Sequence, residues 1–359
     1  MKTLTPVRVG GWGLLALGLA FGAAAPAGEK ARAVRVGAHT LSGPHTCKNL
    51  TIFLIHGKDR LRGKNYLTLQ EALARKQVVV HETQDVNQLT IENLSRHAEL
   101  FVLSGDIIRG GQQDRTIAYD LILRPRSGKV TLAVYCVETG RWGRRGDESD
   151  ATFGSSSANL PSKEAKLAVK GAAPKGSVAG GRVTEGGAQG DVWREVALKQ
   201  RMLSMSLGKA IQAAKSTTSL QLTLEDKKLL KAVDAYTRKL SQILDGKKDV
   251  VGFAFAINGQ VNSADVYASG ALFKKVWPKL LASAVVEAIA EKGRNKKFKP
   301  VKAAAVKALI RDADKAKASS KDVTPRILMV TQETKDNVLF ETRDRDNKGL
   351  PVRKNYIGK

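Results

Sequence analysis

Residues 105–142 read GDIIRGGQQDRTIAYDLILRPRSGKVTLAVYCVETGRW, and this stretch decides the expected fold. Two runs rich in β-branched and aromatic residues, 116–123 and 130–137, flank Arg-Pro-Arg-Ser-Gly at 124–128, which is typical of a turn. Comparable short runs between polar breaks precede them at residues 50–55, 78–82, 89–93 and 100–104. Their spacing predicts an antiparallel sandwich or barrel-like sheet in the N-terminal half, interrupted by one helix at 67–76.

Helical periodicity dominates the C-terminal half. Amphipathic runs predict helices at 191–200, 225–244 and 271–291, with Thr223 as a cap and Pro278 either kinking the last helix or starting a new one. Strands at 250–257 and 260–267 surround Asn258-Gly259, a pair that indicates a tight hairpin. The predicted fold class is therefore α+β, with a helix-rich C-terminal half that contains a β-hairpin.

The N-terminus has the pattern of an export signal. Lys2 and Arg8 precede the apolar run 12–21, and Ala25-Pro26-Ala27 offers small residues for cleavage. We predict a signal peptide over residues 1–27 and a secreted or periplasmic protein, with a retained N-terminal anchor as the alternative. No later segment is long and apolar enough to span a membrane, so no stable span is expected after cleavage.

Two further segments differ in composition from the rest. Residues 143–190 are rich in Gly, Ser, Ala and Lys, which predicts a long loop that serves either as a linker or as a lid over a site. Residues 293–359 form a basic C-terminal extension, for which we predict one helix, two edge strands at 326–331 and 337–342, and a frayed polar end.

The charge balance points to acidic partners. The chain has 60 Lys and Arg against 34 Asp and Glu, a formal net charge of +26. Such a field favours nucleic acid, anionic lipid, acidic polysaccharide or phosphorylated small molecules. An aromatic content of 5% and the lack of zinc-finger, helix-turn-helix or RNA-recognition signatures argue against nucleic acid.

The cysteines and histidines give little support for redox or metal chemistry. Cys47 and Cys136 permit one disulfide in an oxidising compartment, or remain as buried thiols. The five histidines show no HxxxH or HxH pair, so we expect neither a metal site nor a cofactor.

The glycine-rich turn before residue 116 is a candidate anion site. Gly110 and Gly111 permit positive φ, and neighbouring amides in such a turn can form an anion-binding concavity. Arg109 and Arg115 could add bidentate contacts to phosphate or carboxylate. The turn lacks the Gly-Lys-Ser/Thr that closes a P-loop. The alternative is a purely structural turn, in which Gln113 and the arginines connect neighbouring loops.

The strand end at 134–142 supplies the remaining candidates. Strand alternation places Cys136 and Glu138 on one face, where a carboxylate beside a thiol could position a water, a metal or a substrate amide. Glu138 could instead neutralise Arg115 or Arg141 in a buried pair. Trp142 stacks on a ligand or caps the core. The candidate catalytic residues are Glu138 and Cys136, and the candidate ligand-binding residues are Gln113, Arg115, Arg141, Trp142, Gly110 and Gly111. Asp265, a lone acid in an apolar strand, either caps the next helix or joins the site.

These motifs resemble one known bacterial family. Cys47-Lys-Asn-Leu-Thr-Ile-Phe53, Gly105-Asp106 with Gly110 to Arg115, and Cys136-Val-Glu-Thr-Gly-Arg-Trp142 are similar to the ARG and rhodanese-phosphatase-superfamily-associated protein domain. Asp191-Val-Trp193 and residues 252–281 add to the resemblance. It covers residues 45–292, while residues 293–359 match poorly and Asp106 stands where Glu is expected.

The resemblance implies a link to ADP-ribose or nucleotide chemistry by context, without naming a reaction. We therefore expect a protein that binds or hydrolyses phosphorylated, nucleotide-like ligands of the ADP-ribose type. The alternative is a non-enzymatic exported domain that binds acidic polymers through its basic surface. The expected partner is a small anionic ligand or an acidic polymer, and whether the protein is an enzyme stays open.

Overall fold

The computed structural model describes Met1 and residues 34–83, 85–147, 153–171, 187–293 and 298–359. Residues 2–27 of the predicted signal peptide lie outside the described residues. Within the described ranges, no helix combines the length and the apolar character needed to cross a membrane.

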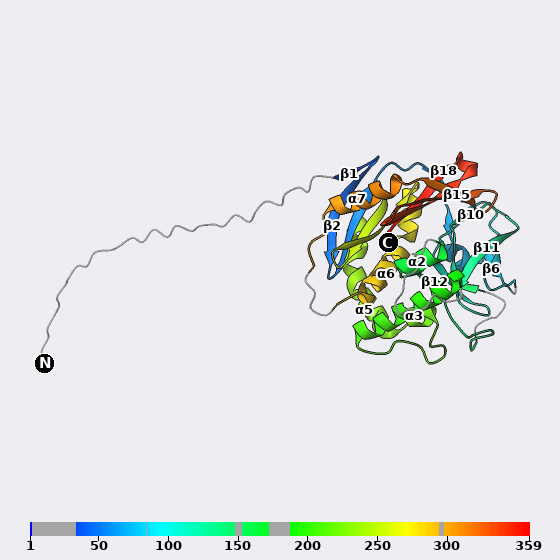
Figure 1. The fold of residues 1–359 in the computed structure, drawn as a ribbon, viewed down its shortest axis with the longest axis horizontal. Helices are drawn as coiled ribbons and strands as arrows, with labels where there is room; N and C mark the ends of the chain where they lie inside the picture. The colour runs from blue at the N-terminus through cyan, green and yellow to red at the C-terminus, as the bar shows by residue number, and fades with distance from the viewer. Residues whose placement is uncertain (2–33, 84, 148–152, 172–186, 294–297) are drawn as a thin grey trace. The chain divides into compact units, whose positions relative to one another are not determined.

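A nine-stranded antiparallel sheet organises the fold (Figure 1). Its strands are, in spatial order, β1 (Val34–Val36), β2 (His39–Cys47), β3 (Leu50–His56), β13 (Val250–Ile257), β14 (Gln260–Tyr267), β18 (Leu350–Gly358), β17 (Asn337–Asp344), β16 (Ile327–Glu333) and β15 (Ala318–Asp322). The sheet thus joins the two ends of the described chain, since N-terminal β3 pairs with β13 and C-terminal β18 pairs with β14.

The hairpin β13–β14 occupies the middle of this sheet and forms as expected. Asn258 and Gly259 both adopt positive φ, at 53° and 82°, as a two-residue hairpin turn requires. Every residue of β13 is buried, which explains its unbroken apolar sequence. Gly252 lies where the two strands approach closely, because a Cβ added there would be 2.1 Å from the Asp265 carbonyl oxygen.

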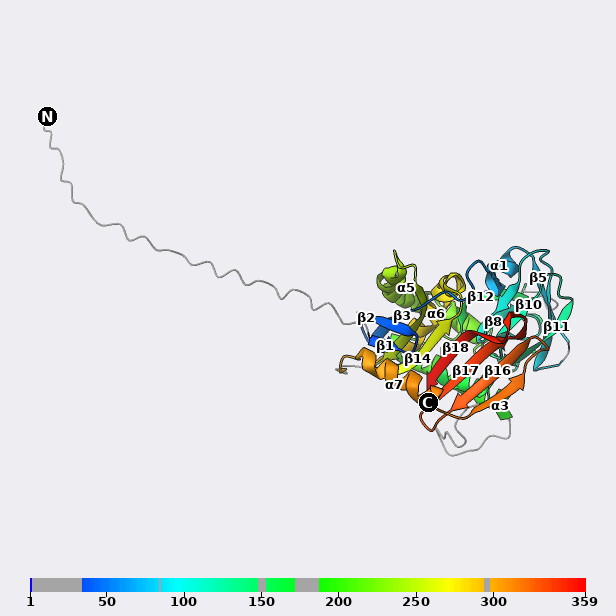
Figure 2. The ribbon, with the colours of Figure 1, turned by 90° about the horizontal axis from the view of Figure 1, so that it is seen from above.

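Helices cover both faces of the nine-stranded sheet (Figure 2). On one face α7 (Ala303–Asp314) packs Val306, Leu309 and Ile310 onto the sheet. On the other lie α5 (Lys227–Leu240) and α6 (Gly270–Ala290), with α6 flanked by α3 (Gly187–Leu207) and α5. The core of the molecule therefore lies mainly between this second face and the α6 layer.

Two smaller sheets form a second β region. The six-stranded sheet has the order β12 (Phe153–Asn159), β8 (Asp106–Gly110), β9 (Arg115–Ile117), β11 (Lys129–Cys136), β6 (Gln88–Asn93) and β5 (Val78–His81). The three-stranded sheet has the order β10 (Leu121–Leu123), β7 (Leu100–Val102) and β4 (Leu67–Thr68). Helix α1 (Leu69–Ala74) follows with a capping box between Thr68 and Glu71. The α+β class is confirmed, with antiparallel pairing throughout except for the parallel pair β4–β7.

Both compositional segments differ from the predictions. Residues 143–190 are not a continuous loop, because they contain β12, α2 (Lys163–Val169) and the start of α3; residues 148–152 and 172–186 are outside the described part. The two strands predicted at 326–331 and 337–342 are present as β16 and β17, but they are interior strands of the main sheet and not edge strands. The end of the chain is not frayed, because it forms β18, which pairs with the distant strand β14.

Two helix details also differ from expectation. Helix α5 is capped by Asp226, whose carboxylate accepts from the Lys228 and Leu229 amides, and Thr223 lies within the preceding α4 (Leu220–Leu224). Helix α6 runs continuously through Pro278. Burial on nearly all sides of α6 compensates for the backbone hydrogen bond that proline cannot donate.

The close approach at Gly252 makes a stability prediction. Gly252→Ala should lower the free energy of unfolding by at least about 1–3 kcal/mol, because the new methyl must displace the β14 backbone. The urea midpoint by circular dichroism measures the effect. Gly143→Ala is the matched control, since a Cβ there meets no atom within 4 Å. Equal midpoints for the two variants would contradict this account of the hairpin.

Candidate functional site

The glycine-rich turn between β8 and β9 is an anion-binding concavity whose anions are the protein's own carboxylates. The Gly110 amide donates to Asp114 Oδ1 at 3.2 Å, and the Gln112 amide donates to Glu82 Oε1 at 2.9 Å. Gly111 adopts a φ of 55° and leaves no room for a side chain, because a Cβ would be 2.3 Å from Phe153 Cζ. The turn therefore has the predicted geometry, but its amides already donate hydrogen bonds to carboxylates of the protein.

A buried ion-pair network continues from this turn. Arg141 Nε donates to Glu138 Oε2 at 2.9 Å and its Nη1 donates to the Gly111 carbonyl at 3.0 Å. Arg145 Nη1 donates to Asp114 Oδ2 at 2.7 Å and lies 3.4 Å from Glu138 Oε1. Glu138 and Asp114 are fully buried, so both carboxylates depend on these two arginines.

Ser219 completes the network from a distant part of the chain. Its hydroxyl donates to Asp114 Oδ2 at 2.9 Å and accepts from Arg145 Nη1 at 3.2 Å, while also capping α4 through the Leu222 amide. Burial raises the pKa of Asp114, and the Arg145 hydrogen bond and charge oppose that rise. The sequence left two interpretations of Glu138 open. Its contacts fit the one in which buried arginines neutralise its charge, and these arginines are Arg141 and Arg145.

Arg115 and Gln113 lie beside this network without comparable partners. Arg115 is 1% exposed and Gln113 is 0% exposed. Arg115 Nη1 donates to the Gln113 carbonyl at 2.8 Å, its Nε has no partner, and no carboxylate of the described residues lies within 4 Å. Neither polar atom of the Gln113 side-chain amide has a partner among the described residues. A buried, uncompensated guanidinium is unusual and marks a place where an anion would be stabilised.

Cys136 lies opposite Arg115 in the β9–β11 register. Its backbone N–H and C=O are both bonded by the Gln189 side chain, at 2.9 Å each, and its thiol is buried. Burial raises the pKa of Cys136 to about 11, although the Arg115 charge acts in the opposite direction. The thiol is thus protonated near neutral pH, which makes it a poor nucleophile. Both Cys136 and Cys47 are free in this structure, so they form no disulfide.

Trp142 does not cap the core. It is 58% exposed, which overturns that alternative and leaves its ring available to solvent or to a ligand. Within the described ranges, no group of three His, Cys, Asp or Glu side chains is arranged to hold a metal ion.

A second buried polar cluster lies between the main sheet and the smaller sheets, and sequence reasoning largely missed it. Arg353 of β18 bonds Asp265 of β14 and, at 2.9 Å, Asp120 from the segment before β10. Asp120 also accepts from the Ser104 amide and the Thr342 hydroxyl. Burial raises the pKa of Asp120, but the Arg353 and Lys170 charges bring it below its usual range. Asp265 is therefore a partner of Arg353, and the cap of α6 is Ser269.

Lys170, the C-cap residue of α2, lies at the edge of this cluster. Its Nζ is 3.3 Å from Asn355 Oδ1 and 4.4 Å above the Phe340 ring, in a small crevice that Asp120 and Thr342 also line. Burial and the nearby Arg353 charge lower the pKa of Lys170 from 10.5 to about 7. No sequence pattern singles out this lysine, because a lysine at the end of an ordinary exposed helix has the same local sequence.

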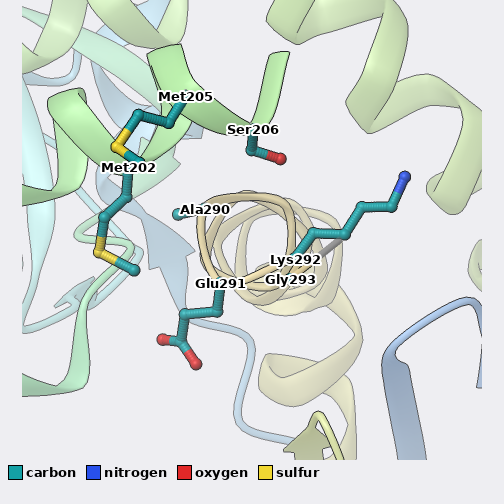
Figure 3. Close-up of a pocket in the computed structure, with 7 residues that line it drawn as sticks. All are labelled: Met202, Met205, Ser206, Ala290, Glu291, Lys292 and Gly293. Carbon is teal, nitrogen blue, oxygen red and sulfur yellow. The ribbon is translucent and has the colours of Figure 1, made fainter. Parts of the chain in front are cut away.

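A separate cavity lies between the C-terminal ends of α3 and α6 (Figure 3). Its volume is about 880 Å³, and its lining residues are Met202, Met205, Ser206, Ala290, Glu291, Lys292 and Gly293. Glu291 is paired with Lys199 at 3.4 Å. The negative ends of two helix dipoles make this cavity less favourable for phosphate than for an uncharged group. The Glu291 charge is offset by Lys199, and Lys292 also lines the cavity.

Comparison with known families explains the arrangement of motifs. A sequence model of the ARG and Rhodanese-Phosphatase-superfamily-associated Protein domain matches residues 38–348. The chain belongs to this family. The match extends well beyond the expected residues 45–292 into the C-terminal strands, in agreement with their place in the main sheet. No curated protein and no solved structure matches the chain.

Lys170 gives this family member a testable pH dependence. Its pKa of about 7 in the folded state lies below the unfolded value of about 10.4, so between these limits the unfolded state binds more protons. The Lys170 contribution to unfolding free energy should thus rise with pH from 7 to 10, by at most about 1.4 kcal/mol per pH unit.

Urea unfolding at pH 7 and pH 10 measures this contribution against two variants. Lys170→Met should be stabilised relative to wild type at pH 7, and this advantage should shrink by pH 10. Lys170→Arg, which stays charged throughout, should lack the rise. A difference between wild type and Lys170→Met that is constant from pH 7 to pH 10 would rule out a lowered pKa.

Proposed function

We propose that this protein is a non-enzymatic binding protein that holds acidic polymers on the lysine-rich face of α5. The observation that carries the proposal is a row of exposed lysines on this helix without ion-pair partners. The long-range attraction comes from the whole chain, whose formal net charge is +26.

Helix α5 separates apolar and basic residues cleanly. Leu229, Tyr236 and Leu240 are buried against the core. Lys227, Lys228, Lys231 and Lys239 are exposed, and among the described residues none of the four has a carboxylate within 4 Å. The acids on the helix are committed elsewhere, because Asp234 pairs with Arg238 and Asp226 caps the helix. These lysines are therefore available to an external anion.

The buried networks support binding rather than catalysis. Asp114 and Glu138 are held by two arginines, and Asp120 and Asp265 are held by Arg353. A general acid or base needs access to a substrate proton, which a fully buried and paired carboxylate lacks. The polar residues of the family motifs thus stabilise the fold, and the exposed cations are the groups that can bind a partner.

Heparin affinity tests the α5 face. Lys227→Gln/Lys228→Gln/Lys231→Gln should elute from heparin at lower salt than wild type, because three exposed charges are lost while helix propensity is kept. The slope of log Kd against log salt should fall by up to about 3. Lys129→Gln/Lys302→Gln/Lys335→Gln removes the same charge from exposed positions elsewhere and serves as the matched control. Equal elution of the two triple variants would remove α5 from the proposal.

A second candidate function rests on Arg115. The lack of a carboxylate partner for this buried guanidinium favours a phosphorylated, nucleotide-like ligand, with Gln113 as a neighbouring amide. Arg141 contributes less, since Glu138 and the Gly111 and Gly143 carbonyls already accept from it. Binding of this kind requires local opening, because Arg115 and Gln113 have almost no exposed surface.

Arg115→Met distinguishes a ligand site from a structural arginine. If Arg115 awaits an anion, removing its uncompensated charge should leave the melting temperature of the ligand-free protein unchanged or higher. The thermal stabilisation that ADP-ribose gives wild type should then disappear. Arg124→Met, at an exposed arginine, is the control. A wild type that no member of a nucleotide panel stabilises, or an Arg115→Met protein that is strongly destabilised without ligand, would contradict this function.

A further inference from the structure

Helix α3 carries one apolar face that is buried in the fold and a second one that the fold covers only in part. Val192, Val196 and Leu203 are buried in the core. On the other side, Leu198 is 38% exposed and Met205 is 68% exposed, while Met202 between them is partly buried and packs against the core. We call Leu198, Met202 and Met205 the outer stripe. Single exposed apolar residues are ordinary, but a stripe at i, i+4 and i+7 is the pattern of a contact surface.

The charges beside the outer stripe are positive. Arg201 is exposed and lies four positions before Met205, on the same side of α3, while Lys209 is exposed and lies just beyond the end of the helix. Lys209 is 3.8 Å from Asp226, the cap of α5, which brings the basic face of α5 next to the end of α3. On α5 itself the exposed Leu230 lies among Lys227, Lys228 and Lys231. Both regions thus combine exposed apolar side chains with exposed cations, of which Lys209 is paired with Asp226.

The cavity at the helix ends extends this surface inward. Met202 and Met205 line it together with the end of α6, and in Figure 3 they lie on one side of that end while Lys292 extends from the other. Its apolar wall and its negative helix ends suit an uncharged chain, whereas Arg201 and Lys209 outside it suit an anion. An amphiphile with an anionic head and an apolar tail satisfies both requirements.

We infer that the outer stripe and the neighbouring cations dock this protein peripherally on an anionic lipid surface. The stripe inserts at the level of the acyl boundary, while the arginine and lysine side chains reach the headgroups. The choice of a lipid over a protein partner rests on charge complementarity. Beside the stripe and on the neighbouring α5, the exposed cations Arg201, Lys227, Lys228 and Lys231 have no carboxylate within 4 Å among the described residues. The apolar residues of the stripe are one leucine and two flexible methionines. This inference goes beyond the proposed function, because it requires the apolar stripe as well as the cations and assigns a lipid surface rather than a polymer.

Vesicle sedimentation of the full chain tests the inference. Wild type should bind vesicles of phosphatidylglycerol and phosphatidylcholine and should not bind phosphatidylcholine alone. Leu198→Gln/Met205→Gln should weaken binding to the anionic vesicles by at least about tenfold, because two inserted apolar side chains are lost. Its elution from heparin should not change, since no charge is altered. Leu94→Gln, at an exposed leucine in the loop after β6, is the matched control and should bind as wild type does.

The possible results separate the two proposals. Heparin binding without anionic vesicle binding, equal binding to uncharged vesicles, or an unaffected Leu198→Gln/Met205→Gln variant would overturn the lipid surface and leave the polymer proposal standing. Vesicle binding without heparin binding would overturn the polymer proposal alone. A wild-type dimer that Leu198→Gln/Met205→Gln converts to a monomer in sedimentation velocity would assign the stripe to a second copy of the chain, against the inference. Failure to bind either material would overturn both.

Discussion

Arg353 is buried between the nine-stranded sheet and the smaller sheets, and it is neutralised from both sides. Asp265 reaches it from the neighbouring strand β14, and Asp120 reaches it from the segment that leads into β10. A buried guanidinium without these carboxylates would cost several kcal/mol, so the second β region must be placed where Asp120 can meet it. The Thr342 hydroxyl and the Ser104 amide then hold Asp120 in position. The lowered pKa of Lys170 and the small crevice beside it follow from this placement.

The same principle applies to the polar residues of the family motifs. Asp114 and Glu138 are taken out of water by the fold, and Arg141 and Arg145 compensate them within the same turn. Paired in this way, the two carboxylates stabilise the arrangement of the loop, and their hydrogen bonds go to groups of the protein itself. Arg115 is the exception, because it is equally buried but lacks a carboxylate. Among the described residues, exposed cations without a carboxylate partner lie on α5, next to the outer stripe of α3.

Much of the fold could be predicted because its signals are local. Alternating β-favouring runs with intervening turns predicted the antiparallel sheets, and Asn258-Gly259 predicted the turn residues of the central hairpin. Strands β12 and β18 could not be recognised in the same way, because pairing with the distant strands β8 and β14 rather than local composition keeps them in place. One of the two interpretations of Glu138 was a buried pair with Arg115 or Arg141, and its contact is with Arg141, which follows it closely in the chain. Arg145 and Ser219 were missed, because their place beside Asp114 depends on the packing of α4.

The sequence by itself determined the α+β class, the family, and the excess of positive charge, because each depends on residue types and their spacing along the chain. Only the tertiary structure decided which charges remain available. Of two arginines in neighbouring motifs, Arg141 lies against Glu138 and Arg115 lies against an amide carbonyl, a difference that no local pattern encodes. The reason is physical: the energy of a charge depends on its burial and on its partners, and both are set by segments that meet only when the chain is folded.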